Sequence, residues 1–133
     1  MNNKILGIAV NGALILIISL ALMFATVWWR MQTQFKAGEA AWKKGDFVAA
    51  VAGYEAAIHM YIPGSPLIEK SAARLWEIGE KNEQSGDLTR ALIAYRALRS
   101  SFYAAKWLKT PGQSWIDRCD KKIAALIPYQ REK

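Results

Sequence analysis

The chain begins with a long apolar stretch and then changes to a mixed pattern of apolar and charged positions. From Ile5 to Trp29 it carries no charged residue over twenty-five positions. At about 1.5 Å per residue, a helix of this length measures roughly 37 Å, enough to cross a hydrocarbon core of about 30 Å. The pattern predicts one transmembrane helix, and we place the anchor at residues 1–30.

A cleaved signal peptide is the alternative interpretation of this stretch. The apolar run is longer than the usual central region of such a peptide, and the residues around Ala21 and Ala25 give no small-x-small cleavage site before a polar mature start. Trp28 and Trp29 end the run and Arg30 follows it, and both indoles and cations favour the headgroup region of a membrane. We therefore expect an anchor that is not cleaved.

The rest of the chain contains an approximate internal repeat with helical spacing. Seven positions recur 41 residues later: Gly38, Glu39, Gly45, Asp46, Ala50, Tyr54 and Ala56 return as Gly79, Glu80, Gly86, Asp87, Ala91, Tyr95 and Ala97. Glycine enters the left-handed region at a helix end without steric penalty, and aspartate caps the helix that follows. Each unit therefore predicts a helix, a Gly-Asp turn and a second helix.

At these residues the sequence resembles the tetratricopeptide repeat family. The resemblance covers about residues 31–103 and is carried by the segment Gly38–Tyr54 and by Ile78 to Tyr95. It implies two helical hairpins, at about 31–62 and 72–105. The family spacing is about 34 residues, and we place the excess of about seven in the connector around Ile62–Leu67.

A further helix is predicted near the end of the sequence. Ile116, Cys119, Ile123 and Leu126 form an apolar stripe at helical spacing, as in an amphipathic helix that covers an open repeat end. We place this capping helix at 114–127 and expect Pro128 to end it. The predicted fold is all-α, with a transmembrane helix and then a domain at 31–133 of two hairpins plus the capping helix.

Charge separates the two parts of the chain. The sequence has 18 basic and 11 acidic residues, a net charge of +7, and Lys4 is the only charged residue before Arg30. Four cations lie soon after the span, so the positive-inside rule favours a cytoplasmic domain at the inner membrane, with the periplasmic side as the alternative. The lone Cys119 excludes an internal disulfide and fits a reducing compartment.

Basic and aromatic residues are interleaved towards the end of the chain. Such a surface suits anionic lipid headgroups, RNA or an acidic partner, and the nearby membrane favours lipid over nucleic acid. The alternative is that the aromatic residues belong to the core and the cations to a solvated face. The predicted basic-aromatic patch consists of Arg99, Phe102, Tyr103, Lys106, Trp107 and Lys109.

Residues for catalysis are scarce. His59 is the only histidine and Cys119 the only cysteine, so no cluster of these residues for a metal or nucleophile forms within one chain. The turn around Gly64 lacks the Gly-Lys-Ser/Thr ending of a phosphate loop. We expect no enzyme activity, no cofactor and no metal.

The resemblance implies that the first helix of each hairpin lines a concave surface for a partner peptide or helix. The predicted groove residues are Phe35, Glu39, Trp42, Lys43, Trp76, Glu80 and Glu83. Within the span, a buried carboxamide favours a hydrogen-bond partner, and small residues allow another helix to come close. The predicted transmembrane contacts are Ala9, Asn11, Gly12 and Ala13.

These features predict a membrane-anchored adaptor or accessory subunit of a bacterial inner-membrane complex. Its partners are expected to be other subunits of that complex, bound through the span and the repeat surface, together with membrane lipid. The alternative function is a membrane organiser that binds anionic lipid through the basic-aromatic patch.

Overall fold

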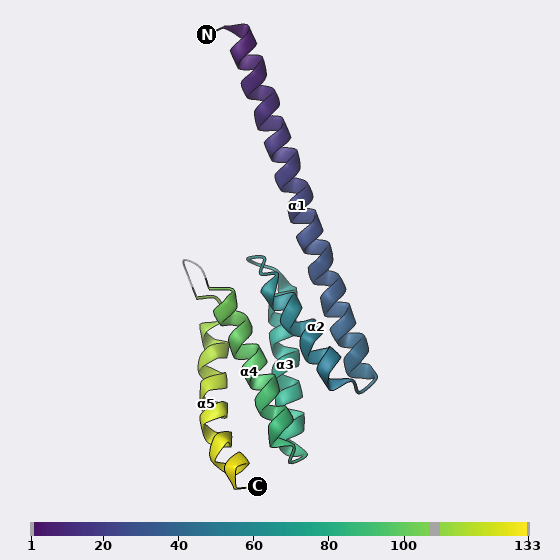
Figure 1. Cartoon of the computed structure of the whole chain (residues 1–133), viewed down its shortest axis with the longest axis vertical. Helices are drawn as coiled ribbons and strands as arrows, with labels where there is room; N and C mark the ends of the chain where they lie inside the picture. Colours follow the sequence, from purple (N-terminus) through teal and green to yellow (C-terminus); the bar gives the residue numbers. More distant parts are fainter. Residues whose placement is uncertain (1, 107–109, 133) are drawn as a thin grey trace.

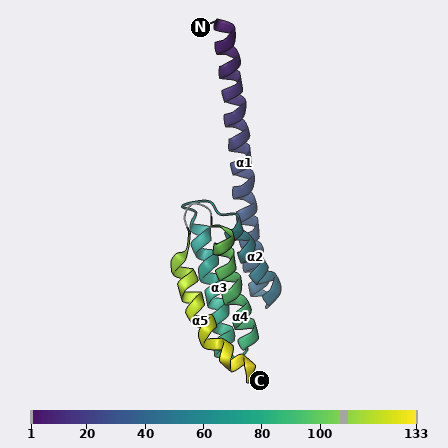
Figure 2. The ribbon, with the colours of Figure 1, turned by 60° about the vertical axis from the view of Figure 1, so that its left-hand side comes forward.

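The computed structural model describes residues 2–106 and 110–132, and these residues form five helices. They are α1 (Asn3–Lys43), α2 (Phe47–His59), α3 (Pro66–Gln84), α4 (Leu88–Ala104) and α5 (Gln113–Arg131). Over the described ranges the fold is all-helical, with one long apolar N-terminal helix followed by a helical domain, as predicted. The N-terminal part of α1 stands clear of that domain (Figures 1 and 2).

The anchor and the first helix of the domain are one continuous helix. α1 runs through the predicted boundary at residue 30 without a break, and the first proline of the chain is Pro63. It is long and apolar enough to span a membrane. Its apolar part is exposed, whereas Met31 and Gly38 further along are buried. The span and the first helix of the packed domain therefore share one helix axis.

Short turns pair α1 with α2 and α3 with α4. Gly45 and Gly86 have φ values of 76° and 81°, in the region that glycine tolerates best. Asp46 accepts a hydrogen bond from the Ala49 N–H at 3.1 Å, and Asp87 accepts one from the Arg90 N–H at 3.0 Å. Both predicted Gly-Asp turns are confirmed in detail.

The helices alternate in direction, so the turns fall at two opposite ends of the domain (Figure 1). The Gly-Asp turns lie at the end far from the apolar part of α1. The α2–α3 connection lies at the other end, beside the middle of α1. Consequently one end of the domain is held near the predicted membrane surface.

Small residues let α1 and α2 pack closely. A Cβ atom on Gly53 would come within 2.6 Å of the Gly38 nitrogen and 2.7 Å of its Cα. Tyr54 and Tyr95 are fully buried and hold equivalent places in the two hairpins. Ile116 and Cys119 of α5 extend the same core, so α5 covers an open side of α4, as predicted for a capping helix.

Two helix boundaries differ from the prediction. α3 begins at Pro66 because Ser65 caps it and proline suits the first helical position. The residues expected in a connector thus lengthen α3. α5 continues through Pro128 to Arg131 instead of ending there. Pro128 removes one backbone donor, but Ala124, whose carbonyl loses its partner, is exposed and open to water.

Candidate functional site

A hollow lies between the C-terminal part of α1 and α3. Its volume is about 440 Å³. We call it the α1–α3 groove, and its lining residues are Phe35, Glu39, Lys70, Ala73, Arg74 and Glu77. Lys70 and Ala73 are exposed, while the other four are half-buried. The groove thus offers an aromatic ring, a small residue and charges of both signs.

Glu39 and Arg74 join the two walls of this groove. Arg74 donates from Nε to Glu39 Oε1 at 2.7 Å and from Nη2 to Glu39 Oε2 at 3.1 Å. The buried Tyr54 hydroxyl also donates to Glu39, at 2.6 Å. Partial burial alone would raise the pKa of Glu39, but the hydrogen bonds from Arg74 and Tyr54 outweigh it and hold the pKa below its ordinary value.

Charged pairs continue along the α1-facing side of α3. Arg74 Nη1 donates to Glu77 at 2.9 Å, and Lys81 Nζ lies 2.9 Å from the other Glu77 oxygen. Lys81 also lies over the Trp42 ring, 5.1 Å from its centroid. These contacts hold Arg74 and Glu77 of the groove lining in place.

A second set of contacts joins α3 to α5. Lys122 donates to both Glu83 oxygens, at 3.0 and 2.8 Å, and the Tyr95 hydroxyl donates to Glu83 at 2.9 Å. Burial favours a higher pKa for Glu83, yet the hydrogen bonds from Lys122 and Tyr95 lower it overall. Each hairpin therefore buries a tyrosine whose hydroxyl binds a glutamate, and a cation on the following helix pairs with that glutamate.

Trp76 belongs to the α3–α5 side. Its ring lies 5.0 Å from Tyr95 and 6.2 Å from Trp115 between centroids, and the Arg118 guanidinium lies 4.2 Å from its centroid. Trp115 in turn donates from Nε1 to Glu69 at 2.9 Å. The indole of Trp76 is therefore already packed within the chain.

The structure thus distributes the predicted groove residues over two places. Phe35 and Glu39 line the α1–α3 groove, and Trp42 packs against Lys81 of α3, while Lys43 is exposed at the end of α1. Trp76, Glu80 and Glu83 share the other face of α3, because they are spaced at helical intervals of three and four. Trp76 and Glu83 contact α5 there.

Sequence reasoning missed the α3 side of the groove. Lys70, Arg74, Glu77 and Lys81 follow one another at intervals of four, three and four, which marks a charged stripe on one helix face. The stripe was a usable signal, but a charged stripe is also what any solvated helix face shows. Only the packing of α3 beside α1 gives it a partner.

The predicted basic-aromatic patch is only partly a surface. Phe102 is 1% exposed and belongs to the core, so its place in the patch is wrong. Arg99 Nε lies 2.5 Å from Asp120 Oδ1, and its guanidinium covers the Tyr103 ring. Lys106 is exposed. The predicted positions Trp107 and Lys109 lie outside the described residues.

The predicted transmembrane contacts are exposed on α1. Ala9, Gly12 and Ala13 share one helix face at intervals of three and four, whereas Asn11 points away from Ala9 and Ala13. A Cβ on Gly12 would meet nothing within 4 Å. This face is exposed among the described residues, and its contact with another helix stays a prediction.

The two residues weighed for metal or nucleophilic chemistry lie apart. His59 ends α2 and lies 4.0 Å from Glu55, while Cys119 is buried in α5. Burial, with the nearby Asp120, raises the pKa of the Cys119 thiol to about 12, so the thiol stays neutral. Within residues 2–106 and 110–132, no three His, Cys, Asp or Glu side chains group as metal ligands. The absence of enzyme activity stays a prediction.

Comparison with known proteins adds no assignment: no family model matches the chain, and no curated protein or solved structure matches it significantly. The tetratricopeptide resemblance therefore stays a prediction that rests on the residues quoted for it.

Proposed function

We propose that this chain is a non-enzymatic, membrane-anchored adaptor or accessory subunit of a bacterial inner-membrane complex. In this proposal its tetratricopeptide-like hairpins bind a helix or extended segment of another subunit in the α1–α3 groove, and α1 holds the domain at the membrane. The observation that carries the proposal is the groove itself. It combines Phe35 and Glu39 of α1, the helix that leaves the apolar span, with the exposed Lys70 and the Glu39-paired Arg74 of α3.

Two features support this function over the lipid-organiser alternative. The groove charges are held by mutual hydrogen bonds, so a partner meets a preorganised surface and loses less entropy on binding. The basic-aromatic patch is weaker than expected, because Arg99 is paired and Phe102 is buried.

The test fills the groove without touching the core. Ala73 is exposed and lines the groove, so Ala73→Trp should block a partner while leaving the domain folded. Ala52→Trp, at an exposed position of α2 outside the groove lining, is the matched control. After mild detergent extraction, we expect Ala73→Trp to lose a co-purifying subunit that wild type and Ala52→Trp retain. Equal helicity by circular dichroism shows that the fold is intact.

A folded Ala73→Trp protein that keeps the partner would remove the groove as the binding site. Binding would then have to occur through the span or another face of the domain.

A further inference from the structure

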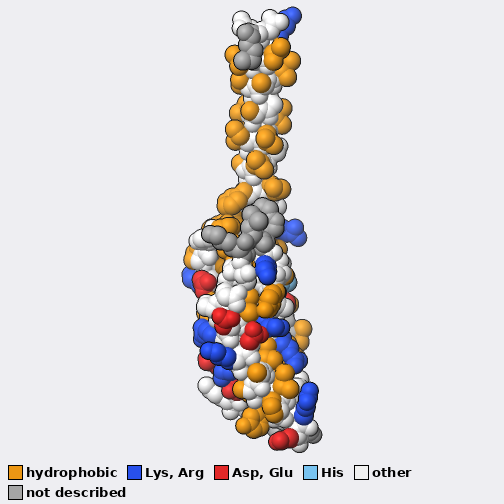
Figure 3. Space-filling model, turned by 90° about the vertical axis from the view of Figure 1, so that its left-hand side faces the viewer, with side chains coloured by type: hydrophobic (Ala, Val, Ile, Leu, Met, Phe, Trp, Pro, Cys, Tyr) orange, Lys and Arg blue, Asp and Glu red, His pale blue; other side chains and the backbone are white. Residues whose placement is uncertain are grey.

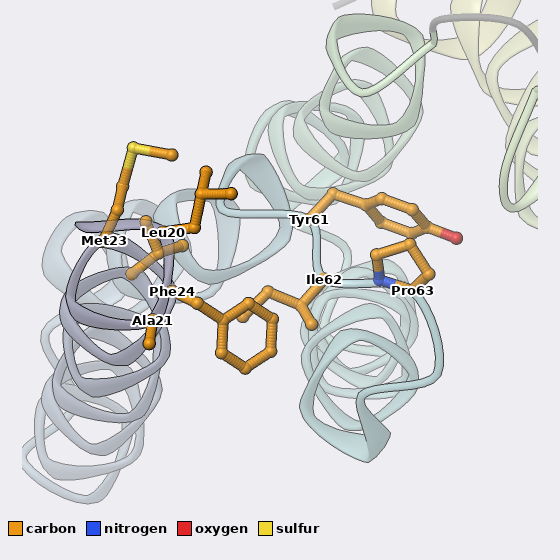
Figure 4. Close-up of a pocket in the computed structure, with 8 residues that line it drawn as sticks. Leu20, Ala21, Met23, Phe24, Tyr61, Ile62 and Pro63 are labelled. Carbon is orange, nitrogen blue, oxygen red and sulfur yellow. The ribbon is translucent and has the colours of Figure 1, made fainter. Parts of the chain in front are cut away.

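A second hollow lies where α1 enters the domain. It has a volume of about 650 Å³ and is walled on one side by the apolar part of α1. The other wall is the α2–α3 connection (Figure 4). We call it the juncture notch. The α1 wall includes Leu20, Phe24 and Val27. The connection wall consists of Tyr61, Ile62 and Pro63.

The connection is held firmly against α1. Ile62 is buried, with 7% exposure, and Figure 4 shows the Phe24 ring directed toward it. Ser65 caps α3 and its hydroxyl contacts the sulfur of the buried Met31 at 3.8 Å. Pro63 and Pro66 restrict the backbone on either side of Gly64, which has a φ of 80°. The notch is therefore a fixed feature of the fold.

With the predicted span placed across a bilayer, the notch falls at the depth of the membrane and not of the cytoplasm or periplasm. The apolar run from Ile5 to Trp29 is about 37 Å long, so a hydrocarbon core of about 30 Å that begins at Ile5 ends near Phe24. The connection packs beside Leu20 and Phe24 and thus reaches past Arg30 by roughly 9 to 15 Å along α1. Hydrophobic side chains continue from α1 to the adjoining end of the domain, while charges gather beyond (Figure 3).

We infer that the α2–α3 connection dips into the bilayer and that the juncture notch holds a phospholipid acyl chain. Its lining is made of apolar and aromatic side chains, and one wall is the span itself, so the notch opens directly into hydrocarbon. Its volume lies in the usual range of small-molecule sites, about 300 to 1,000 Å³. Tyr61, 37% exposed, carries a hydroxyl suited to the headgroup level. Arg30 follows the span directly, is exposed and suits a phosphate group at the headgroup level.

This inference rests on the proposed function only in requiring α1 to span the membrane, and the experiment tests that requirement separately. The full chain is labelled with a fluorophore at Tyr61→Cys and reconstituted in phosphatidylcholine vesicles whose acyl chains carry a bromine quencher. Ile15→Cys, in the middle of the span, reports on the anchor. Val48→Cys, beside the Gly45-Asp46 turn, reports on the far end of the domain. Wild type, whose only cysteine is buried, is the labelling blank.

We expect the probe at Tyr61→Cys to lose fluorescence to an extent similar to Ile15→Cys, while Val48→Cys stays bright. Quenching at Ile15→Cys without quenching at Tyr61→Cys would overturn the inference and leave the anchor in place. Absence of quenching at both positions would overturn the anchor and the inference together.

A second variant tests the acyl chain itself. Ala21 lines the notch and is exposed, so Ala21→Trp should fill it. Leu14→Trp places the same indole on the span outside the notch. By native mass spectrometry from detergent, we expect Ala21→Trp to retain fewer phospholipids than wild type and Leu14→Trp. Equal retention in all three proteins would show that the notch does not hold the chain.

Discussion

Gly53 lies where the backbones of α1 and α2 come together. Its absent Cβ leaves room for the Gly38 nitrogen and Cα and for the Gln34 carbonyl oxygen, all of which are backbone atoms. Backbone cannot move aside as a flexible side chain can, so this contact sets the separation of the two helices. A single hydrogen atom in place of a methyl group therefore decides how the first hairpin packs.

Gly53→Ala should destabilise the domain, because the added methyl group meets this backbone. Overpacking of this kind costs about 1 to 3 kcal/mol. Urea unfolding followed by circular dichroism measures the loss. Gly12→Ala is the control, since its Cβ would meet nothing within 4 Å, and equal stability of the two variants would contradict the packing described for α1 and α2.

Glu39 and Glu83 give the domain a predictable response to acid. Both have a folded-state pKa below the ordinary value of 4.5 because cations and tyrosine hydroxyls stabilise the carboxylates. A lowered folded-state pKa adds stability that is present above the unfolded pKa and is lost as pH falls through the folded one. The melting temperature should therefore drop as pH falls below about 4.5.

The double variant Glu39→Gln, Glu83→Gln isolates this effect. It should be less stable than wild type at pH 7 and should show a shallower drop in acid, as measured by thermal unfolding across pH. Glu132→Gln, at an exposed position near the end of the chain, should behave like wild type. An unchanged acid response in the double variant would mean that other carboxylates control it.

At the element scale, α1 combines two roles in one helix. Its apolar part has no buried residue, and its later part buries Met31 and Gly38 in the domain. Because the backbone is continuous, the orientation of the span fixes how the domain meets the membrane. The sequence predicted both roles, yet not their continuity, since the change in composition at Arg30 looked like a boundary.

Leu16→Arg should weaken membrane insertion. A cation at the centre of a span costs about 2.5 to 3.5 kcal/mol on insertion scales. Membrane fractionation under carbonate wash, with an intact-mass measurement to detect cleavage, follows the effect. Val48→Arg, at a 74% exposed position of the domain, should fractionate as wild type does; if Leu16→Arg does so too, the anchor assignment fails.

At the scale of the whole molecule, α3 makes polar contacts with helices on both of its sides. One of its faces is tied to α1 through Arg74, and the other is tied to α5 through Glu83. α4 and α5 close the core around Phe102, Ile116 and Cys119. Two hairpins alone leave an open end, so we expect α5 to unfold together with the two hairpins as one unit.

The reactivity of the Cys119 thiol tests whether the domain unfolds as one unit. The thiol is fully buried and its pKa is raised to about 12, so at pH 8 it should react slowly with a thiol reagent. As urea increases, the labelling rate should rise in step with the loss of helicity. Fast labelling while the helicity is still native would show that α5 detaches separately from the two hairpins.

The sequence by itself determined the elements whose signals are local. The apolar run from Ile5 to Trp29, the two Gly-Asp turns and the apolar stripe of α5 predicted helices because caps, breakers and periodicity act over a few residues. Local signals were insufficient for helix ends: Ser65 and Pro66 started α3 earlier than expected, and Pro128 did not end α5.

Only the tertiary structure decided which faces meet. The charged stripe of α3 forms one side of a groove because it packs beside α1. Trp76 packs against α5 and not in that groove. The juncture notch likewise combines Phe24 with Ile62, thirty-eight residues apart in the chain. The sequence pattern determines on which side of a helix a residue lies. Which residue it contacts there depends on how the five helices pack to bury their apolar faces.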